Sequence, residues 1–129
     1  MTPILRVARP TLDFEPLRRF YCDGLGFALL SSFSDHDGFE GWIVGHPRAP
    51  YHLEFVRHAQ VGAVRAPTHE HQLVLYLPDA ADWQAALARM RAAGCAEVEP
   101  FNPWWRGRGA TFEDADGYRV VLINGAWNK

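Results

Sequence analysis

One order of secondary-structure elements occurs twice along the 129-residue chain. Segments with the periodicity of a strand, a helix and three further strands come first, at 4–9, 11–27, 27–33, 42–46 and 51–58. The same order returns at 71–77, 78–94, 95–99, 110–114 and 118–124. Asp13 precedes the first predicted helix and Asp79 precedes the second, 66 positions later. This spacing indicates a duplicated βαβββ module.

The duplication predicts an α+β fold in a single domain, made of module 1 (1–60) and module 2 (68–129). Each module needs a cover for the apolar face of its sheet. Docking the modules edge to edge with the helices outside gives a half-open barrel with a concave central cavity. A concave surface between two repeats is a typical small-molecule site.

Composition excludes several other classes of protein. Hydrophobic residues make up 48% and charged residues 22% of the chain, which is typical of a globular domain. The formal net charge of −2, with both signs interspersed, gives no basic footprint for nucleic acid. No apolar run reaches the length of a membrane span, and the first ten residues do not resemble a secretory signal. We therefore expect a cytoplasmic protein, with Cys22 and Cys95 reduced.

Three stretches in the chain resemble motifs of one known family. "FYCDGLGF" (20–27) resembles the end of the first helix in the vicinal oxygen chelate superfamily, which contains glyoxalase I, bleomycin-resistance proteins and extradiol dioxygenases. "YHLEF" (51–55) resembles its fourth strand, and "FEDADGYRVVL" (112–122) its closing turn and last strand. The motifs occur in the family's order over nearly the whole chain. The resemblance implies the fold, but this fold hosts lyases, oxygenases and plain binding proteins.

Metal-dependent members of this family hold their ion with residues from the first and fourth strand of each module. The resemblance places Arg6, Glu54, Gln72 and Val121 at these four positions. Only Glu54 and Gln72 offer oxygen atoms that can bind a metal, because arginine is always cationic and valine is apolar. Two ligands do not make a divalent site. We therefore expect no metal or other cofactor.

A rearranged metal site remains the alternative. His52 shares a strand face with Glu54, and a shift of one residue would put His71 in the place of Gln72. A divalent ion held by Glu54, Gln72 and His52 or His71 would make the protein a metal-dependent lyase or dioxygenase.

Arg6 suggests a different partner for Glu54. If both residues face the concave surface, an ion pair between them satisfies two partly buried charges. The alternative is that Arg6 points into solvent and Glu54 is an exposed edge residue, since exposed charges are the norm.

The loops after the second strand of each module add further candidates. His36 lies between Asp35 and Asp37 and is either a general acid or base oriented by an aspartate or an exposed turn residue. In the other loop, Trp104 and Trp105 suit stacking on a flat ligand, although one of them could instead plug the sheet.

The sequence thus favours a small-molecule binding protein without the metal of its family. The ligand-binding residues would be Arg6, His52, Gln72, Tyr76, Trp104 and Trp105, with Glu54 and His36 as catalytic residues if the protein is an enzyme. Whether it is an enzyme stays open at this point, and a lyase or dioxygenase is the expected class if it is one. We expect a homodimer, as is common in the family, with no nucleic-acid or membrane partner.

Overall fold

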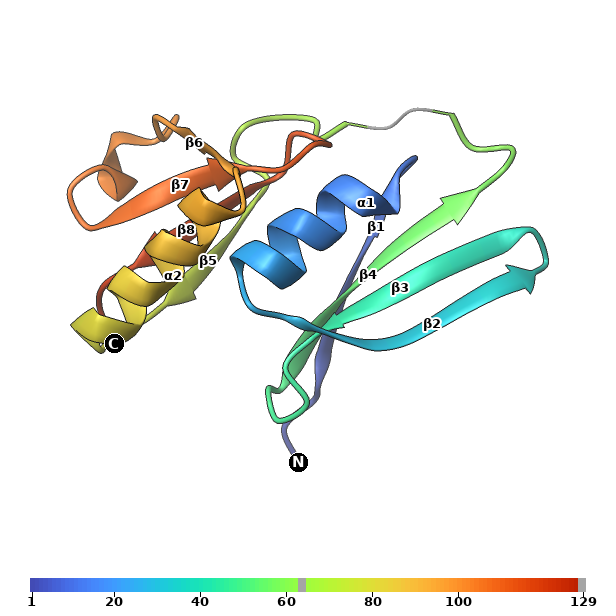
Figure 1. Cartoon of the computed structure of the whole chain (residues 1–129), viewed down its shortest axis with the longest axis horizontal. Helices are drawn as coiled ribbons and strands as arrows, with labels where there is room; N and C mark the ends of the chain where they lie inside the picture. The colour runs from blue at the N-terminus through green and yellow to red at the C-terminus, as the bar shows by residue number, and fades with distance from the viewer. Residues whose placement is uncertain (63–64, 128–129) are drawn as a thin grey trace.

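The computed structural model describes residues 1–62 and 65–127 and contains the predicted order of elements twice (Figure 1). The elements of module 1 are β1 (Leu5–Pro10), α1 (Phe14–Leu17), η1 (Arg18–Gly24), β2 (Ala28–His36), β3 (Phe39–Gly45) and β4 (Tyr51–His58). The elements of module 2 are β5 (Gln72–Tyr76), α2 (Ala80–Ala92), β6 (Ala96–Val98), η2 (Pro103–Trp105), β7 (Gly109–Glu113) and β8 (Arg119–Ile123).

Both modules form a four-stranded mixed sheet with the same strand order. The first sheet runs β1-β4-β3-β2 and the second runs β5-β8-β7-β6. In each, the first strand pairs in parallel with the fourth, and the remaining neighbours are antiparallel. This topology confirms the predicted fold of two βαβββ modules. The two sheets are not closed into a barrel.

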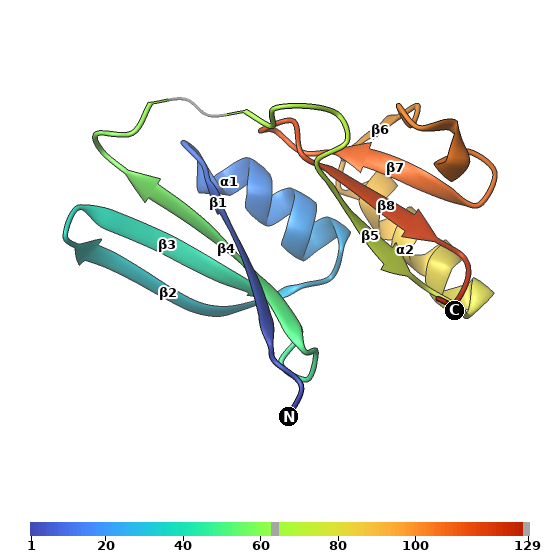
Figure 2. The ribbon, with the colours of Figure 1, turned by 180° about the vertical axis from the view of Figure 1, so that it is seen from behind.

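The helices cover one face of each sheet. Leu53 and Phe55 of β4 turn toward the helix of module 1, where Phe14 stacks on Trp42 with the ring centroids 5.1 Å apart. In module 2, Val120 and Leu122 belong to the same core cluster as the buried side of α2. Seen from behind, β1, β4, β5 and β8 lie in front of both helices (Figure 2). Each sheet therefore has a second face without a helix, which we call its open face.

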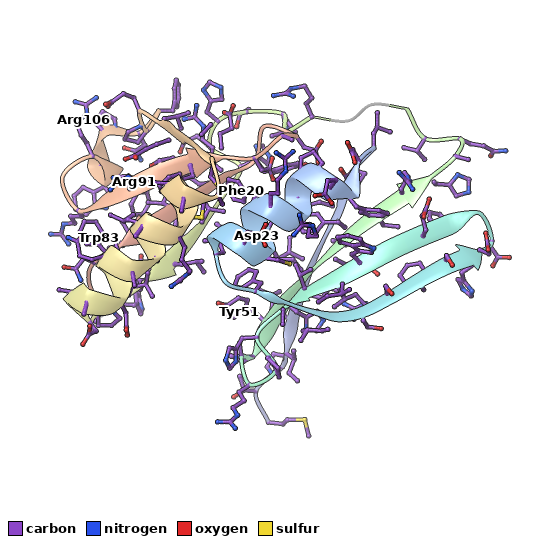
Figure 3. All side chains as sticks on the ribbon, viewed as in Figure 1. Phe20, Asp23, Tyr51, Trp83, Arg91 and Arg106 are labelled. Carbon is purple, nitrogen blue, oxygen red and sulfur yellow. The ribbon has the colours of Figure 1, made fainter. Side chains whose placement is uncertain are left out.

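The two modules pack through their helices. A Cβ atom on Gly24, at the end of η1, would lie 2.7 Å from Sδ of Met90 and 3.0 Å from Sγ of Cys95. Phe20, which η1 also contributes, is buried and lies where the two helices meet (Figure 3). A glycine at position 24 therefore allows η1 to approach the end of α2 closely.

A buried polar contact also joins the modules. The hydroxyl of Tyr21 on η1 donates to Oδ2 of Asp114 at 2.7 Å, and the backbone N–H groups of Asp116 and Tyr118 donate to Oδ1. Burial raises the pKa of Asp114, and burial also raises the pKa of Tyr21, helped by the Asp114 carboxylate. Burial of these two polar groups is tolerated because each is the hydrogen-bond partner of the other.

Two local features differ from the predictions. The helix predicted over 11–27 begins at Phe14, with Asp13 accepting from the N–H of Glu15, and becomes a π-helix from Arg18 onward. The predicted loop after the second strand is a tight turn between β2 and β3. Asp35 and Asp37 adopt positive φ angles of 54° and 53° there, a conformation that aspartate tolerates better than most residues. In the described part of the chain, no helix is long and apolar enough to cross a membrane.

We predict that Tyr21→Phe lowers the free energy of unfolding by about 1–3 kcal/mol, because it leaves a buried carboxylate oxygen without its donor. Urea unfolding measures the change, with Tyr76→Phe as the control, since Tyr76 is 38% exposed. Equal stability of the two variants would show that the contact between Tyr21 and Asp114 does not hold the modules together.

Candidate functional site

The open face of the first sheet carries the polar residues that the sequence singled out. Strand alternation puts Arg6, His52 and Glu54 on this face, because their neighbours Val7, Leu53 and Phe55 pack toward the helix. In the parallel pairing of β1 and β4, Arg6 lies beside His52, and Glu54 is one step further along the same face. We call Arg6, His52 and Glu54 the arginine cluster.

Hydrogen bonds and charge hold the arginine cluster together. Nε of Arg6 donates to Nε2 of His52 at 2.8 Å, and Nη1 of Arg6 lies 3.7 Å from Oε2 of Glu54. The Glu54 side chain is 17% exposed and that of Arg6 is 46% exposed. The predicted pairing of Arg6 with Glu54 is therefore present. The sequence suggested that the two residues would face each other across the concave surface. They are instead diagonal neighbours on the adjacent strands β1 and β4.

The contact with Arg6 fixes the chemistry of His52. Because Nε2 accepts from a guanidinium, the proton of the neutral ring sits on Nδ1 and no lone pair remains for a metal. The cluster then has one positive and one negative charge. It offers a guanidinium that is half exposed, with no hydrogen bond from its Nη2 to another described residue.

Glycines on the neighbouring strand β3 make room beside the arginine cluster. Gly45 pairs with His52, and a Cβ there would lie 3.1 Å from Cβ of His52. At Gly41 a Cβ would lie 2.6 Å from the ring of Phe33, so the ring rests directly on the backbone of β3. The open face thus joins a polar cluster to a flat aromatic surface, which suits a ligand with both kinds of group.

The metal-ligand positions of the fold do not form a metal site. Arg6 occupies one position and engages both His52 and Glu54, while Val121 at another is fully buried. Within residues 1–62 and 65–127, no group of three or more His, Cys, Asp and Glu side chains could hold an ion. The residues present do not fit the divalent ion that related folds carry.

The other predicted binding residues lie in module 2. Gln72 pairs with Arg119 in the register of β5 and β8, and Tyr76 shares the open face with it, as the alternation predicted. His71 precedes β5 and is exposed, with its Nδ1 2.9 Å from the hydroxyl of Thr68. Gln72 has the same place in the register of β5 that Arg6 has in the register of β1. Gln72 rather than His71 therefore stands at the metal-ligand position, and the shift of one residue does not occur.

The loop candidates separate into exposed and half-buried side chains. His36 ends β2 at the turn and is exposed, and no described contact links it to Glu54. Trp104 is 65% exposed and lies over the guanidinium of Arg108, 5.5 Å from the ring centroid. Trp105 is half-buried. Neither His36 nor the two tryptophans is joined to the arginine cluster by a described contact.

An apolar groove that was not predicted from the sequence lies between the edge strands β1 and β5 of the two sheets. It has a volume of about 240 Å³ and runs between β1 and β5, lined by Leu5, Val7, Tyr51, His52, Leu73 and Leu75 among others. Tyr51 stands at the start of β4, facing the space between the modules (Figure 3). The apolar residues Leu5 and Val7 of β1 were visible in the sequence, but the sequence does not show which strand of the other module lies beside them.

Family models match both halves of the chain. Residues 5–56 match the YycE-like N-terminal domain and residues 70–124 the YycE-like C-terminal domain. The protein YycE of Bacillus subtilis (strain 168), which is uncharacterized, is 38% identical over 120 residues, covering 93% of this chain and 86% of YycE. The crystal structure of YycE has a TM-score of 0.87 at 37% identity and covers 96% of this chain and 90% of the YycE chain.

Other solved structures extend this similarity. TnmS3, an antibiotic binding protein from Streptomyces sp. CB03234, is 28% identical with a TM-score of 0.64, over 95% of this chain and 94% of TnmS3. The trypanothione-dependent glyoxalase I of Leishmania major has a TM-score of 0.73 at 18% identity, over 97% of this chain and 88% of the enzyme. At that identity the match shows the fold alone. These matches confirm the resemblance to the glyoxalase and bleomycin-resistance group.

Proposed function

The chain belongs to the YycE-like family within the glyoxalase and bleomycin-resistance fold, and on this basis we propose that it binds a small molecule on its open faces without a metal ion. The observation that carries the proposal is the arginine cluster. Arg6 stands at a metal-ligand position and supplies a fixed positive charge beside Glu54. The similarity to an antibiotic binding protein supports a binding role rather than a catalytic one.

The arginine cluster is suited to binding rather than to metal catalysis. A guanidinium presents hydrogen-bond donors in a planar fork, and Arg6 leaves part of this fork open to solvent. Glu54 balances the charge, so the face does not select strongly for a charged ligand. The ring of Phe33 on Gly41 adds a flat apolar surface on the same face.

A second copy of the chain is the partner that this proposal requires. The open faces of the two sheets are not closed into one cavity within a chain, and β1 and β5 each pair on only one side among the described strands. Leu5, which lines the groove at the start of β1, is 60% exposed, and the preceding Ile4 is 68% exposed. Docking of a second copy at this edge buries these apolar residues and brings the module 1 face of one copy to the module 2 face of the other. Arg6, Gln72 and Tyr76 then contribute to one site.

We predict that ligand binding depends on Arg6 and does not require metal. A thermal-shift screen of aromatic, thiol-conjugated and antibiotic compounds in the presence of EDTA should give a compound that raises the melting temperature. Its affinity should fall by about tenfold or more in Arg6→Leu, because a buried polar contact to the ligand is lost. Arg48→Leu, which removes another exposed arginine of module 1, serves as the control. Compounds that stabilise only after EDTA is removed would contradict the proposal.

We also predict that Leu5→Asp converts a dimer into a monomer, because the substitution places a charge in the apolar groove between β1 and β5. Light scattering coupled to gel filtration measures the mass of each variant. Leu12→Asp, on a leucine that is 48% exposed and does not line the groove, should leave the dimer intact. A wild-type protein that is monomeric at all concentrations would rule out the shared site.

A further inference from the structure

A second hollow adjoins the apolar groove between β1 and β5. It has a volume of about 330 Å³ and is lined by Leu25, Phe27 and Tyr51 from module 1 and by residues of β5 and α2 from module 2. The hollow and the groove are neighbours, because four residues line both of them: Phe27, Tyr51, Val74 and Leu75. We call this second space the inter-module hollow.

The inter-module hollow is separate from the arginine cluster. Tyr51 belongs to the same face of β4 as Leu53, which turns toward the helix of module 1. On the other side, α2 contributes Ala86 and Arg89 to the lining. None of the three residues of the arginine cluster lines this hollow. The hollow therefore reaches the helix side of the molecule, whereas the arginine cluster lies on the open face of the first sheet.

The guanidinium of Arg89 lies at the wall of the inter-module hollow, where the two modules meet. The connection between η1 and β2 passes beside α2 (Figure 1), and a Cβ atom on Gly26 would lie 3.5 Å from Nε and 3.7 Å from Cζ of Arg89. The guanidinium therefore packs against the backbone of Gly26, directly before Phe27 in the chain. Van der Waals contact with module 1 thus positions a side chain that module 2 supplies.

Arg89 supplies the charge of the inter-module hollow. It is the one charged side chain among the described residues that line this hollow, and no Asp or Glu lines either the hollow or the groove. The side chain of Arg89 has no hydrogen bond or ion pair to another described residue, whereas Nε of Arg91 on the same helix lies 3.0 Å from Oε1 of Glu97. An apolar space with one uncompensated guanidinium at its wall is complementary to an apolar ligand with one negative group.

Two aromatic rings lie where the hollow and the groove adjoin. Phe27 and Tyr51 meet edge to face, with their ring centroids 6.3 Å apart. Burial raises the pKa of Tyr51, so its hydroxyl stays protonated at neutral pH and adds no negative charge to the lining. The rings offer a flat apolar surface, and the phenol does not repel an anion.

We propose that the inter-module hollow binds an apolar carboxylic acid, with its carboxylate on Arg89 and its hydrocarbon body against Phe27, Tyr51 and Leu75. A guanidinium can donate two parallel N–H bonds to a carboxylate, which a neutral group of the same shape cannot accept in full. The apolar lining favours a hydrocarbon body, because its burial removes apolar surface from water. This site goes beyond the proposed function, since it does not use the arginine cluster.

Octanoate and octanamide are matched probes of this site, because they share length and shape and differ in charge. In ¹H–¹⁵N NMR titrations at neutral pH, octanoate should shift the backbone N–H signals of Phe27 and Leu75 in a saturable way. Octanamide should bind about tenfold or more weakly, since the charge-assisted hydrogen bonds are lost. No saturable shift of these signals by millimolar octanoate, or equal affinity for octanamide, would overturn the proposal.

Variants of α2 test the role of Arg89 in the same titrations. Arg89→Gln should bind octanoate about tenfold or more weakly and octanamide as tightly as the wild type does. Arg89→Lys keeps the charge but loses the planar fork, so its affinity for octanoate should be intermediate. Arg91→Gln is the matched control, because Arg91 is exposed on the same helix and does not line the hollow. Wild-type affinity in Arg89→Gln, or an equal loss in Arg91→Gln, would overturn the proposal.

The variant Arg6→Leu separates this site from the proposed function. Octanoate should shift the signals of Phe27 and Leu75 in Arg6→Leu as it does in the wild type, because the arginine cluster does not line the hollow. Binding that is lost in Arg6→Leu and kept in Arg89→Gln would assign the carboxylate to the arginine cluster. That result would overturn the carboxylate site in the hollow and leave the proposed function standing.

Discussion

The packing of η1 against the end of α2 is the constraint on which the rest of the structure depends. Gly24 lets the two helices approach closely, and the Tyr21 hydroxyl bonds to Asp114 across the module boundary. The helices therefore cover one face of each sheet, and the other face of each sheet carries no α-helix (Figures 1 and 2). The two sheets of one chain therefore stay separate and are not closed into a barrel.

The two open faces have become different in ways that a shared fold does not require. Module 1 keeps a short turn between β2 and β3, so the arginine cluster is open to solvent. Module 2 has a longer β6–β7 connection, which contains η2, and Thr111 and Val121 on its open face are buried. In both modules an arginine pairs with a glutamate on the open face, Arg6 with Glu54 and Arg119 with Glu113.

The sequence predicted the fold well because the signals for it are local. Strand alternation, the aspartate that caps each helix and the repeat of the element order each depend on a few neighbouring residues. The pairing of Arg6 with Glu54 was also expected, because the family resemblance placed both residues at metal-ligand positions and only one of them can bind a metal. Contacts that depend on tertiary packing were not predictable. The involvement of His52 as an acceptor, the burial of Arg119 and the contact of Arg89 with the backbone of Gly26 follow from strand register and loop path. The apolar groove between β1 and β5 was missed for the same reason, because alternation shows the face of a strand but not the neighbour of its edge.

The central claim is that Arg6 takes the place of a metal ion beside Glu54. The most direct test compares the metal content of wild-type protein and Arg6→His after purification without chelator, by mass spectrometry of bound divalent ions. We expect fewer than about one ion in ten wild-type chains, because a specific site would bind close to one ion per chain. We expect close to one ion per chain in Arg6→His, where the new imidazole joins His52 and Glu54. One ion per wild-type chain, lost in Glu54→Ala, would contradict the account.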